Sequence, residues 1–179
     1  MAQVLRRVDA ERHADALRRS CSLTHTFYRM YRPGQTKVTP DEIIPVLNQA
    51  GVEFVLMGTY AMGGWMSEVR GTDDVDFLIA TRHHRKAVRA IQQAFPKLKL
   101  KDQKVVSRFI DPASKIVVID LMKPFERFYR EVFENTVPAG RYRIPDLEMA
   151  LVCKFAAMIS PHRVVKKRAR DLGDFMDIV

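Results

Sequence analysis

Two aspartates, Asp74 and Asp76, are the residues whose type and spacing most directly suggest chemistry. They stand two residues apart at the start of an apolar run that predicts a β-strand, so both carboxylates would point to the same face, about 6.5 Å apart along the chain. Mg²⁺ prefers hard oxygen ligands and is commonly held by one or two carboxylates together with phosphates and water. Beside a phosphate-binding turn, such a pair would therefore predict a site for Mg²⁺ or Mn²⁺ and a nucleotide. On its own, such a pair also fits a solvated strand edge.

A possible phosphate-binding turn precedes the aspartates. An apolar run at 54–57 ends at Gly58-Thr59, and glycine lets the backbone turn tightly and approach a ligand closely. The short helix predicted at 60–69 would begin with unpaired N–H groups and a partial positive charge. With a second strand predicted to carry Asp74 and Asp76 and to end at Ile79, this order of elements indicates a turn that holds phosphate next to the carboxylates.

A third carboxylate, Asp120, interrupts an otherwise apolar strand predicted at 115–122. A buried, ionised carboxylate without a partner would be costly, and a metal ion or another cation beside it would remove that cost. A position at the exposed end of the strand, capping the next segment, is the other interpretation. We favour a metal ligand or a base.

These motifs together resemble the signature of the nucleotidyltransferase superfamily, which has the polymerase-beta-like fold. The matching residues are Gly58-Thr59 and Arg70-x-Thr72-x-Asp74-x-Asp76, followed by an apolar strand. Thr59 stands where Gly or Ser is usual and keeps a hydroxyl for phosphate contact. The resemblance implies an α/β (α+β) fold, with a small mixed, twisted sheet, packed helices and a C-terminal helical pair.

The resemblance also implies an activity and a role for each site residue. The activity is metal-dependent transfer of a nucleoside monophosphate from a nucleoside triphosphate to an acceptor hydroxyl, with release of pyrophosphate. Asp74, Asp76 and Asp120 are implied to be catalytic and to hold metal, with Asp120 as ligand of a second ion or as base. The implied nucleotide-binding residues are Gly58, Thr59, Arg70, Thr72, Lys154 and Asp171. Lys154 would meet phosphate as a point charge, or would simply be a helix lysine with its charge in water.

The C-terminal part extends the resemblance to one branch. Ile144-Pro145-Asp146-Leu147, a helix lysine and Arg170-Asp171-x-x-Asp174 resemble the AbiEii-like nucleotidyltransferases, which include toxins of toxin–antitoxin pairs and many uncharacterised bacterial proteins. We therefore expect an N-terminal helical extension at 1–38 and a nucleotidyltransferase domain at 39–179. The branch implies a cognate antitoxin as a further partner, while the clusters of basic residues favour RNA, such as tRNA, or protein as the acceptor.

Composition limits the class of protein and its partners. The chain has 179 residues, of which 47% are hydrophobic and 28% charged, as in a single folded domain. Two distant cysteines without zinc-type spacing predict reduced thiols and a cytoplasmic location. No apolar run approaches the ~20 residues that cross a bilayer, so we expect no membrane partner. The net charge of +9 favours an anionic partner such as RNA, DNA or nucleotide. Basic residues cluster at 82–89, 97–104 and 163–170.

The remaining elements follow from apolar periodicity and capping residues. Thr39, Pro40 and Glu42 predict a capping box at the start of one helix, and Asp146 predicts the N-cap of another, with Leu147, Ala150, Leu151 and Phe155 inward. Helices are predicted at 4–30, 40–50, 85–95, 123–133 and 146–160 and in a last basic segment to 178, with further strands at 104–110 and 140–145.

Two other functions stay open. A transferase acting on a small molecule such as an aminoglycoside would be favoured by a deep acidic pocket. A catalytically silent module that binds nucleotide or nucleic acid would be favoured if Asp120 did not face Asp74 and Asp76.

Overall fold

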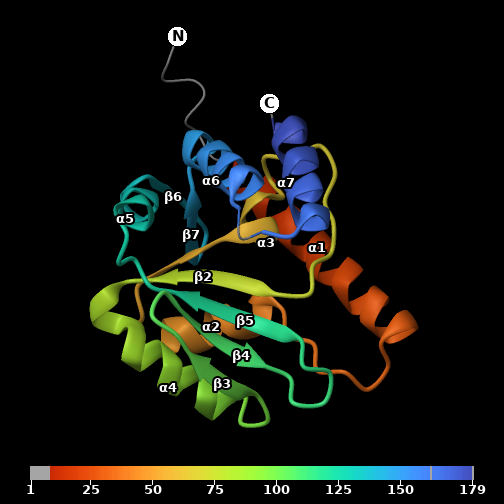
Figure 1. Ribbon diagram of the computed structural model, residues 1–179, viewed down its shortest axis with the longest axis vertical. Helices are drawn as coiled ribbons and strands as arrows, with labels where there is room; N and C mark the ends of the chain where they lie inside the picture. The colour runs from red at the N-terminus through yellow and green to blue at the C-terminus, as the bar shows by residue number, and fades with distance from the viewer. Residues whose placement is uncertain (1–8, 162, 179) are drawn as a thin grey trace.

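A five-stranded mixed sheet forms the centre of the computed structural model, which describes residues 9–161 and 163–178 (Figure 1). Strands β2 and β5 are parallel neighbours, and the other pairs are antiparallel. The predicted mixed α/β fold is confirmed. The strands in their spatial order are β1 (Phe54–Leu56), β2 (Val75–Ile79), β5 (Val117–Met122), β4 (Val106–Ile110) and β3 (Lys99–Asp102).

Helices cover both faces of this sheet. In Figure 1, α2 and α4 lie on one side, and α6 and α7 lie side by side on the other, where they form the predicted C-terminal helical pair. A hairpin of β6 (Thr136–Ala139) and β7 (Tyr142–Pro145) adjoins β1. The helices are α1 (Ala10–Tyr31), α2 (Pro40–Gln49), α3 (Gly58–Met62), α4 (His84–Ala94), α5 (Arg127–Glu134), α6 (Leu147–Ile159) and α7 (Val165–Ile178), with a 3₁₀ turn at Thr81–His83. None of the described helices has the length and apolar character to cross a membrane.

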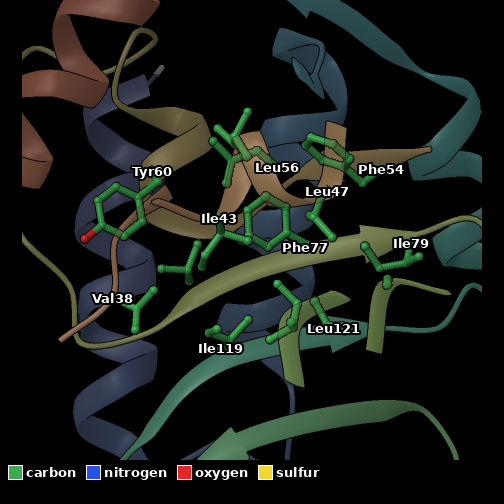
Figure 2. Packing of buried hydrophobic residues seen from close by; sticks show 14 of the residues in the cluster. Val38, Ile43, Leu47, Phe54, Leu56, Tyr60, Phe77, Ile79, Ile119 and Leu121 are labelled. Atoms are coloured by element: carbon green, nitrogen blue, oxygen red, sulfur yellow. The ribbon is translucent and has the colours of Figure 1, made fainter. Parts of the chain in front are cut away.

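The alternation of side chains along β2 and β5 separates the core from the site. Phe77 on β2 and Leu121 on β5 point to the face that Ile43 and Leu47 of α2 cover (Figure 2). Asp76 must then point to the opposite face, because successive residues of a strand alternate. The same strands thus bury a hydrophobic core on one side and present carboxylates on the other.

The predicted capping signals are confirmed. The Thr39 N–H donates to Glu42 Oε2 at 2.9 Å, and Pro40 is the first residue of α2. Gly51 follows the end of this helix with φ of 57°, a left-handed conformation that favours glycine. Asp146 caps α6 by accepting a hydrogen bond from the Met149 N–H at 2.8 Å. Local hydrogen bonding therefore sets these helix ends.

Several element boundaries differ from the sequence prediction. The helix expected at 60–69 begins at Gly58 and ends at Met62, before Gly63-Gly64. A Cβ at Gly64 would lie 2.1 Å from the His13 ring, so close packing of α1 requires glycine there. Strands β3 and β6 were not predicted. The helix predicted at 4–30 spans Ala10–Tyr31, and its first residues lie outside the described part of the chain.

The predicted inward face of α6 is partly wrong. Phe155 is exposed, whereas Ala150 and Lys154 are the buried residues of this helix. The reason is that α7 packs along α6 with two carboxylates toward Lys154. Charge pairing between the helices, rather than apolar periodicity, decides which side of α6 faces inward.

Candidate active site

A cleft of about 760 Å³ opens between the C-terminal half of α1, the open face of the sheet and the beginning of α7. Its lining includes every residue that the sequence analysis assigned to a site, from five separate stretches of the chain. These residues are Gly58, Thr59, Arg70, Thr72, Asp74, Asp76, Asp120, Lys154 and Asp171. The structure therefore brings the candidate catalytic and nucleotide-binding residues together in one place.

Three carboxylates lie on one wall of the cleft. Asp76 on β2 stands directly opposite Asp120 on the parallel strand β5, so the two side chains share a face of the sheet. Asp74 immediately precedes β2, and the Thr72 hydroxyl donates to Asp74 Oδ1 at 2.9 Å. The interpretation of Asp120 as a cap at an exposed strand end is wrong, because Asp120 lies within β5 and its side chain is largely buried.

The electrostatics of this wall favour a cation. Asp76 keeps a partly accessible side chain but lies deep in the domain, and burial followed by the nearby charges of Asp74 and Asp120 raises its pKa to about 8. Burial raises the pKa of Asp120 to about 6, with Asp74 adding to the effect and Arg108 opposing it. Asp120 and Asp76 therefore hold their protons more tightly than ordinary aspartates do, and a bound cation would relieve both effects.

The carboxylates fit a divalent metal ion that nucleotide phosphates help to hold. The Nε of Arg108 lies 3.4 Å from Asp120 Oδ1, and within the described residues neither atom has a hydrogen-bond partner. Among these residues, Asp120 Oδ1 is therefore held only by this ion pair and keeps a lone pair that a metal ion could use. Across residues 9–161 and 163–178, no three His, Cys, Asp or Glu side chains are placed so that they could hold a metal ion by themselves, and this includes Asp74, Asp76 and Asp120. Mg²⁺ is commonly held by one or two carboxylates, with phosphates and water completing its shell.

Gly58 lets the turn after β1 approach the carboxylates. Its φ is 65°, and a Cβ added there would lie 2.4 Å from Asp76 Oδ2. The Met57 N–H also donates to the Asp76 carbonyl at 2.8 Å, which fixes the turn against β2. The backbone at this position therefore requires glycine for two independent reasons, its left-handed conformation and its contact with Asp76.

Replacing Gly58 with alanine is expected to displace the Asp76 carboxylate and to lower the free energy of unfolding by about 1–3 kcal/mol, since a strained φ and a steric overlap add. Denaturant titration measures this loss, and nucleotide binding measures the displacement. Gly140→Ala is the matched control, because Gly140 has φ of 72° with no atom within 4 Å of an added Cβ. An equal effect in both variants would leave no role for the contact with Asp76.

A network of charged side chains joins α6, α7 and the loop before β2. Arg70 donates to both carboxylate oxygens of Asp174, at 3.0 and 2.7 Å. Lys154 Nζ lies 3.4 Å from Asp171 Oδ1 and also pairs with Asp174. Arg163 pairs with Asp171 through Nε and donates from Nη2 at 3.2 Å. Each buried carboxylate thus has two basic partners, which offsets the cost of removing it from water.

The network changes the interpretation of Lys154 and Arg70. Lys154 is 5% exposed and its ammonium faces two carboxylates, so the alternative of a helix lysine with its charge in water is wrong. Arg70 lines the cleft while it is held by Asp174. A phosphate group in the cleft would lie near Arg70 and Lys154, whose charges are already balanced by Asp171 and Asp174. Further positive charge would come from α7.

Helix α1 supports the loop that carries Asp74, one of the candidate catalytic residues. The Ser20 hydroxyl donates to the Arg70 carbonyl, and the Thr72 N–H donates to Thr24 Oγ1 at 3.2 Å. The Tyr60 hydroxyl also donates to Thr24 Oγ1, at 3.0 Å. The predicted boundary between an extension at 1–38 and a domain at 39–179 stays a prediction. The part of α1 near residue 24 contacts the site directly.

Several residues of the cleft were not predicted as site residues. The α1 residues carry no catalytic motif, and Arg108 is one basic residue among many, so neither could be recognised from sequence. Asp174, which pairs with the cleft residues Arg70 and Lys154, could have been recognised from sequence, because it completes the motif Arg170-Asp171-x-x-Asp174. Arg163, Lys167 and Arg170 were predicted only as part of a basic cluster that meets a phosphate backbone. The cleft residues missed are Leu23, Thr24, Phe27, Arg32, Val69, Gly71, Asp73 and Arg108.

Comparison with known proteins identifies the fold. No protein-family model and no curated protein sequence matches the chain. An antigenic nucleotidyltransferase-like protein from Paracoccidioides brasiliensis has a similar structure, with a TM-score of 0.50 and 16% sequence identity over 80% of this chain and 78% of that protein. At this identity the likeness shows the fold alone. The chain thus has the nucleotidyltransferase-like fold that the sequence motifs predict.

Two further solved structures match over smaller parts. JHP933 from Helicobacter pylori has a TM-score of 0.49 and 18% identity, over 75% of this chain and 60% of that chain. Terminal uridylyl transferase 4 from Trypanosoma brucei, solved with bound GTP, has a TM-score of 0.33 and 13% identity, over 67% of this chain and 42% of that chain.

Proposed function

We propose that the protein is a metal-dependent nucleotidyltransferase, which moves a nucleoside monophosphate from a nucleoside triphosphate to an acceptor hydroxyl. The observation that carries this proposal is the convergence of Asp74, Asp76 and Asp120 on one wall of a cleft with seven basic side chains. The basic side chains attract a triphosphate, while the carboxylates repel it unless cations lie between them. That division of charge suits a metal-bound nucleotide.

Each carboxylate has a distinct proposed role. Asp74 and Asp76 would hold Mg²⁺ or Mn²⁺, with Asp74 oriented by the Thr72 hydroxyl. When bound, the metal supplies charge neutralisation for an in-line displacement at the α-phosphorus. Asp120 would hold a second ion or accept the proton of the acceptor hydroxyl. The new bond joins the acceptor oxygen to the α-phosphorus, and the bond to pyrophosphate breaks.

The triphosphate would lie between the glycine turn and α7. Gly58 and Thr59 would cradle the phosphates, with Thr59 offering its hydroxyl, and Lys167 and Arg170 would supply positive charge from α7. The charges of Arg163 and Lys167 already act on Asp76, where they lower its pKa against the larger effect of burial. Arg70, Lys154 and Asp171 would hold α7 in this position through the charge network.

RNA is the proposed acceptor, because a line of basic side chains continues from the carboxylates to the edge of the sheet. Asp120 stands opposite Arg108 on β4, and Arg108 stands opposite Lys101 on β3. Opposed residues of neighbouring strands share a face and lie about 5 Å apart. Lys99 is exposed on the same face, two residues before Lys101. A phosphate backbone could follow this path to the catalytic wall.

Replacing both Lys99 and Lys101 with alanine is expected to reduce the salt dependence of RNA binding. If both lysines neutralise phosphates, the slope of log affinity against log salt concentration should become shallower by about 1 to 2. The matched control is Arg85→Ala with Arg89→Ala, which removes two exposed charges from α4 on the other face of the sheet. Lysines on an edge strand can also prevent association of sheets. An unchanged slope with increased aggregation would assign them that role instead.

Pyrophosphate release tests the proposed function. We expect release to require Mg²⁺, a nucleoside triphosphate and one acceptor class, with RNA, cell protein and an aminoglycoside mixture supplied separately. Pyrophosphate release that requires RNA supports the proposal as stated. Release that requires protein would support nucleotidyl transfer but identify protein as the acceptor. The basic cleft disfavours a cationic aminoglycoside. Tight nucleotide binding without release from any mixture would instead indicate a catalytically silent module.

The finer assignment to the AbiEii-like branch, with a toxin role and a cognate antitoxin, is also a proposal. It is supported by Lys154, Asp171 and Asp174, the residues that resemble that branch, because they contact one another beside the cleft. A cytoplasmic location is proposed on the two free thiols, Cys21 and Cys153.

A further inference from the structure

Helix α1 carries an exposed stripe of large apolar side chains that the proposed chemistry does not use. Leu23, Phe27 and Tyr31 are spaced four residues apart, so they lie on one face of the helix. Their exposed fractions are 46%, 42% and 68%. Exposed apolar side chains that gather on one surface are typical of binding sites.

The stripe runs into the cleft, where its aromatic rings lie close to a cation. Leu23 and Phe27 line the cleft, and the Phe27 and Tyr31 ring centroids are 5.3 Å apart. The Arg32 guanidinium lies 5.2 Å from the centroid of Phe27. Arg32 Nη1 is also 2.8 Å from Asp73 Oδ1, next to the catalytic Asp74. The aromatic surface is thereby anchored to the loop that carries the candidate metal ligands.

We propose that Phe27 and Tyr31, with Arg32, form a platform on which a nucleobase stacks while its phosphates reach the carboxylate wall. This inference rests on the proposed function and names the part of the substrate that α1 recognises. A nucleobase has an apolar face that stacks on aromatic rings and on a guanidinium plane. The phosphates of the same molecule need the basic and metal-binding groups found further into the cleft.

The surroundings of the stripe favour a nucleobase over an apolar protein segment. Seven basic side chains and five carboxylates line the same cleft, so an apolar segment would remove many charges from water without offering them a partner of its own. The platform is also fixed in place, since Thr24 and Ser20, about one and two helical turns before Phe27, bond to the 70–72 backbone. The stacked base could belong to the nucleoside triphosphate or to the terminal nucleotide of the acceptor, and both offer the same surface.

Binding measurements on Phe27→Ala test the platform. We expect the affinity for Mg²⁺–nucleoside triphosphate, or for a short single-stranded RNA, to fall about 5- to 100-fold, as in other losses of base stacking. The affinity for inorganic triphosphate should not change, because it has no base. Phe27→Trp should retain affinity, and its fluorescence should be quenched by the nucleotide but not by inorganic triphosphate. Phe125→Ala is the matched control, since Phe125 is 55% exposed and does not line the cleft.

The pattern of losses identifies the source of the base. If Phe27→Ala lowers the affinity for the nucleoside triphosphate alone, the base that stacks on α1 belongs to the donor nucleotide. If it lowers the affinity for RNA alone, the base belongs to the acceptor. Unchanged affinity for both ligands overturns the platform, as does an equal fall for inorganic triphosphate, which would point to a displaced Arg32. If native protein releases no pyrophosphate but Phe27→Ala still weakens nucleotide binding, the platform stands and the transferase proposal fails.

Discussion

Replacing Asp76 with asparagine is expected to lower nucleotidyl transfer by at least about 10³-fold, equivalent to about 4 kcal/mol of lost transition-state stabilisation. Asp76 lies opposite Asp120 and follows Asp74 at two residues, so its loss would remove one of the proposed metal ligands. Magnesium-dependent binding of nucleoside triphosphate should weaken in parallel. Transfer rates and equilibrium binding with and without Mg²⁺ measure the two effects.

The folded state should survive this substitution. The raised pKa of Asp76 reflects burial and the charges of Asp74 and Asp120, and a neutral amide removes both costs. We therefore expect an unchanged or higher free energy of unfolding. Asp102→Asn is a control with the same change of charge on the same sheet but outside the cleft. Near-native transfer by a folded Asp76→Asn protein would remove Asp76 from the active site.

Replacing Asp174 with alanine is expected to lower the free energy of unfolding by about 3–5 kcal/mol, because a buried ion pair that loses one partner leaves an uncompensated charge. Lys154 would keep one carboxylate, Asp171, and Arg70 would lose both of its hydrogen bonds. Denaturant titration measures the loss. A loss below about 1 kcal/mol, as for an exposed pair, would contradict a structural role for this network.

Two further measurements separate charge pairing from packing. Lys154→Met combined with Asp174→Leu should cost less than the sum of the single changes, because both buried charges leave together. Asp177→Asn on the same helix should have no comparable effect, since its partner Ser67 is exposed. Burial alone would raise the pKa of Asp174, but Arg70 and Lys154 hold it below its usual range. The stabilisation is therefore present above the unfolded pKa and is lost as pH falls through the lower folded pKa.

The features that could be predicted from the sequence are those set by local rules. Asp76 shares a face with Asp120 because side chains alternate along β2, whereas Asp74, which was predicted on the same strand, lies just before it. Gly58 marks a position that requires a left-handed backbone. The Thr39 and Asp146 caps depend on residues within a single turn of helix. The position of Asp120 beside Asp76 follows from pairing of two strongly apolar strands, and the resemblance to a known superfamily supplied their order.

The features that could not be predicted depend on contacts between distant segments. Thr24 bonds to the backbone of Thr72 and to Tyr60, so α1 forms a wall of the cleft although its own sequence shows only an irregular apolar face. Lys154 became a buried residue because Asp171 and Asp174 face it from α7. Strand β3 contains two exposed lysines and gains its pairing from β4, which propensity alone does not indicate.

The position of the transferred label tests the central claim most directly. The protein is incubated with Mg²⁺, total RNA and each of the four nucleoside triphosphates in turn, labelled either at the α-phosphate or at the γ-phosphate. Attack at the α-phosphorus beside Asp74, Asp76 and Asp120 predicts that one nucleotide transfers its α-label covalently to RNA, while the γ-label leaves as free pyrophosphate. Covalent transfer of the γ-label would indicate a kinase and contradict the proposed chemistry.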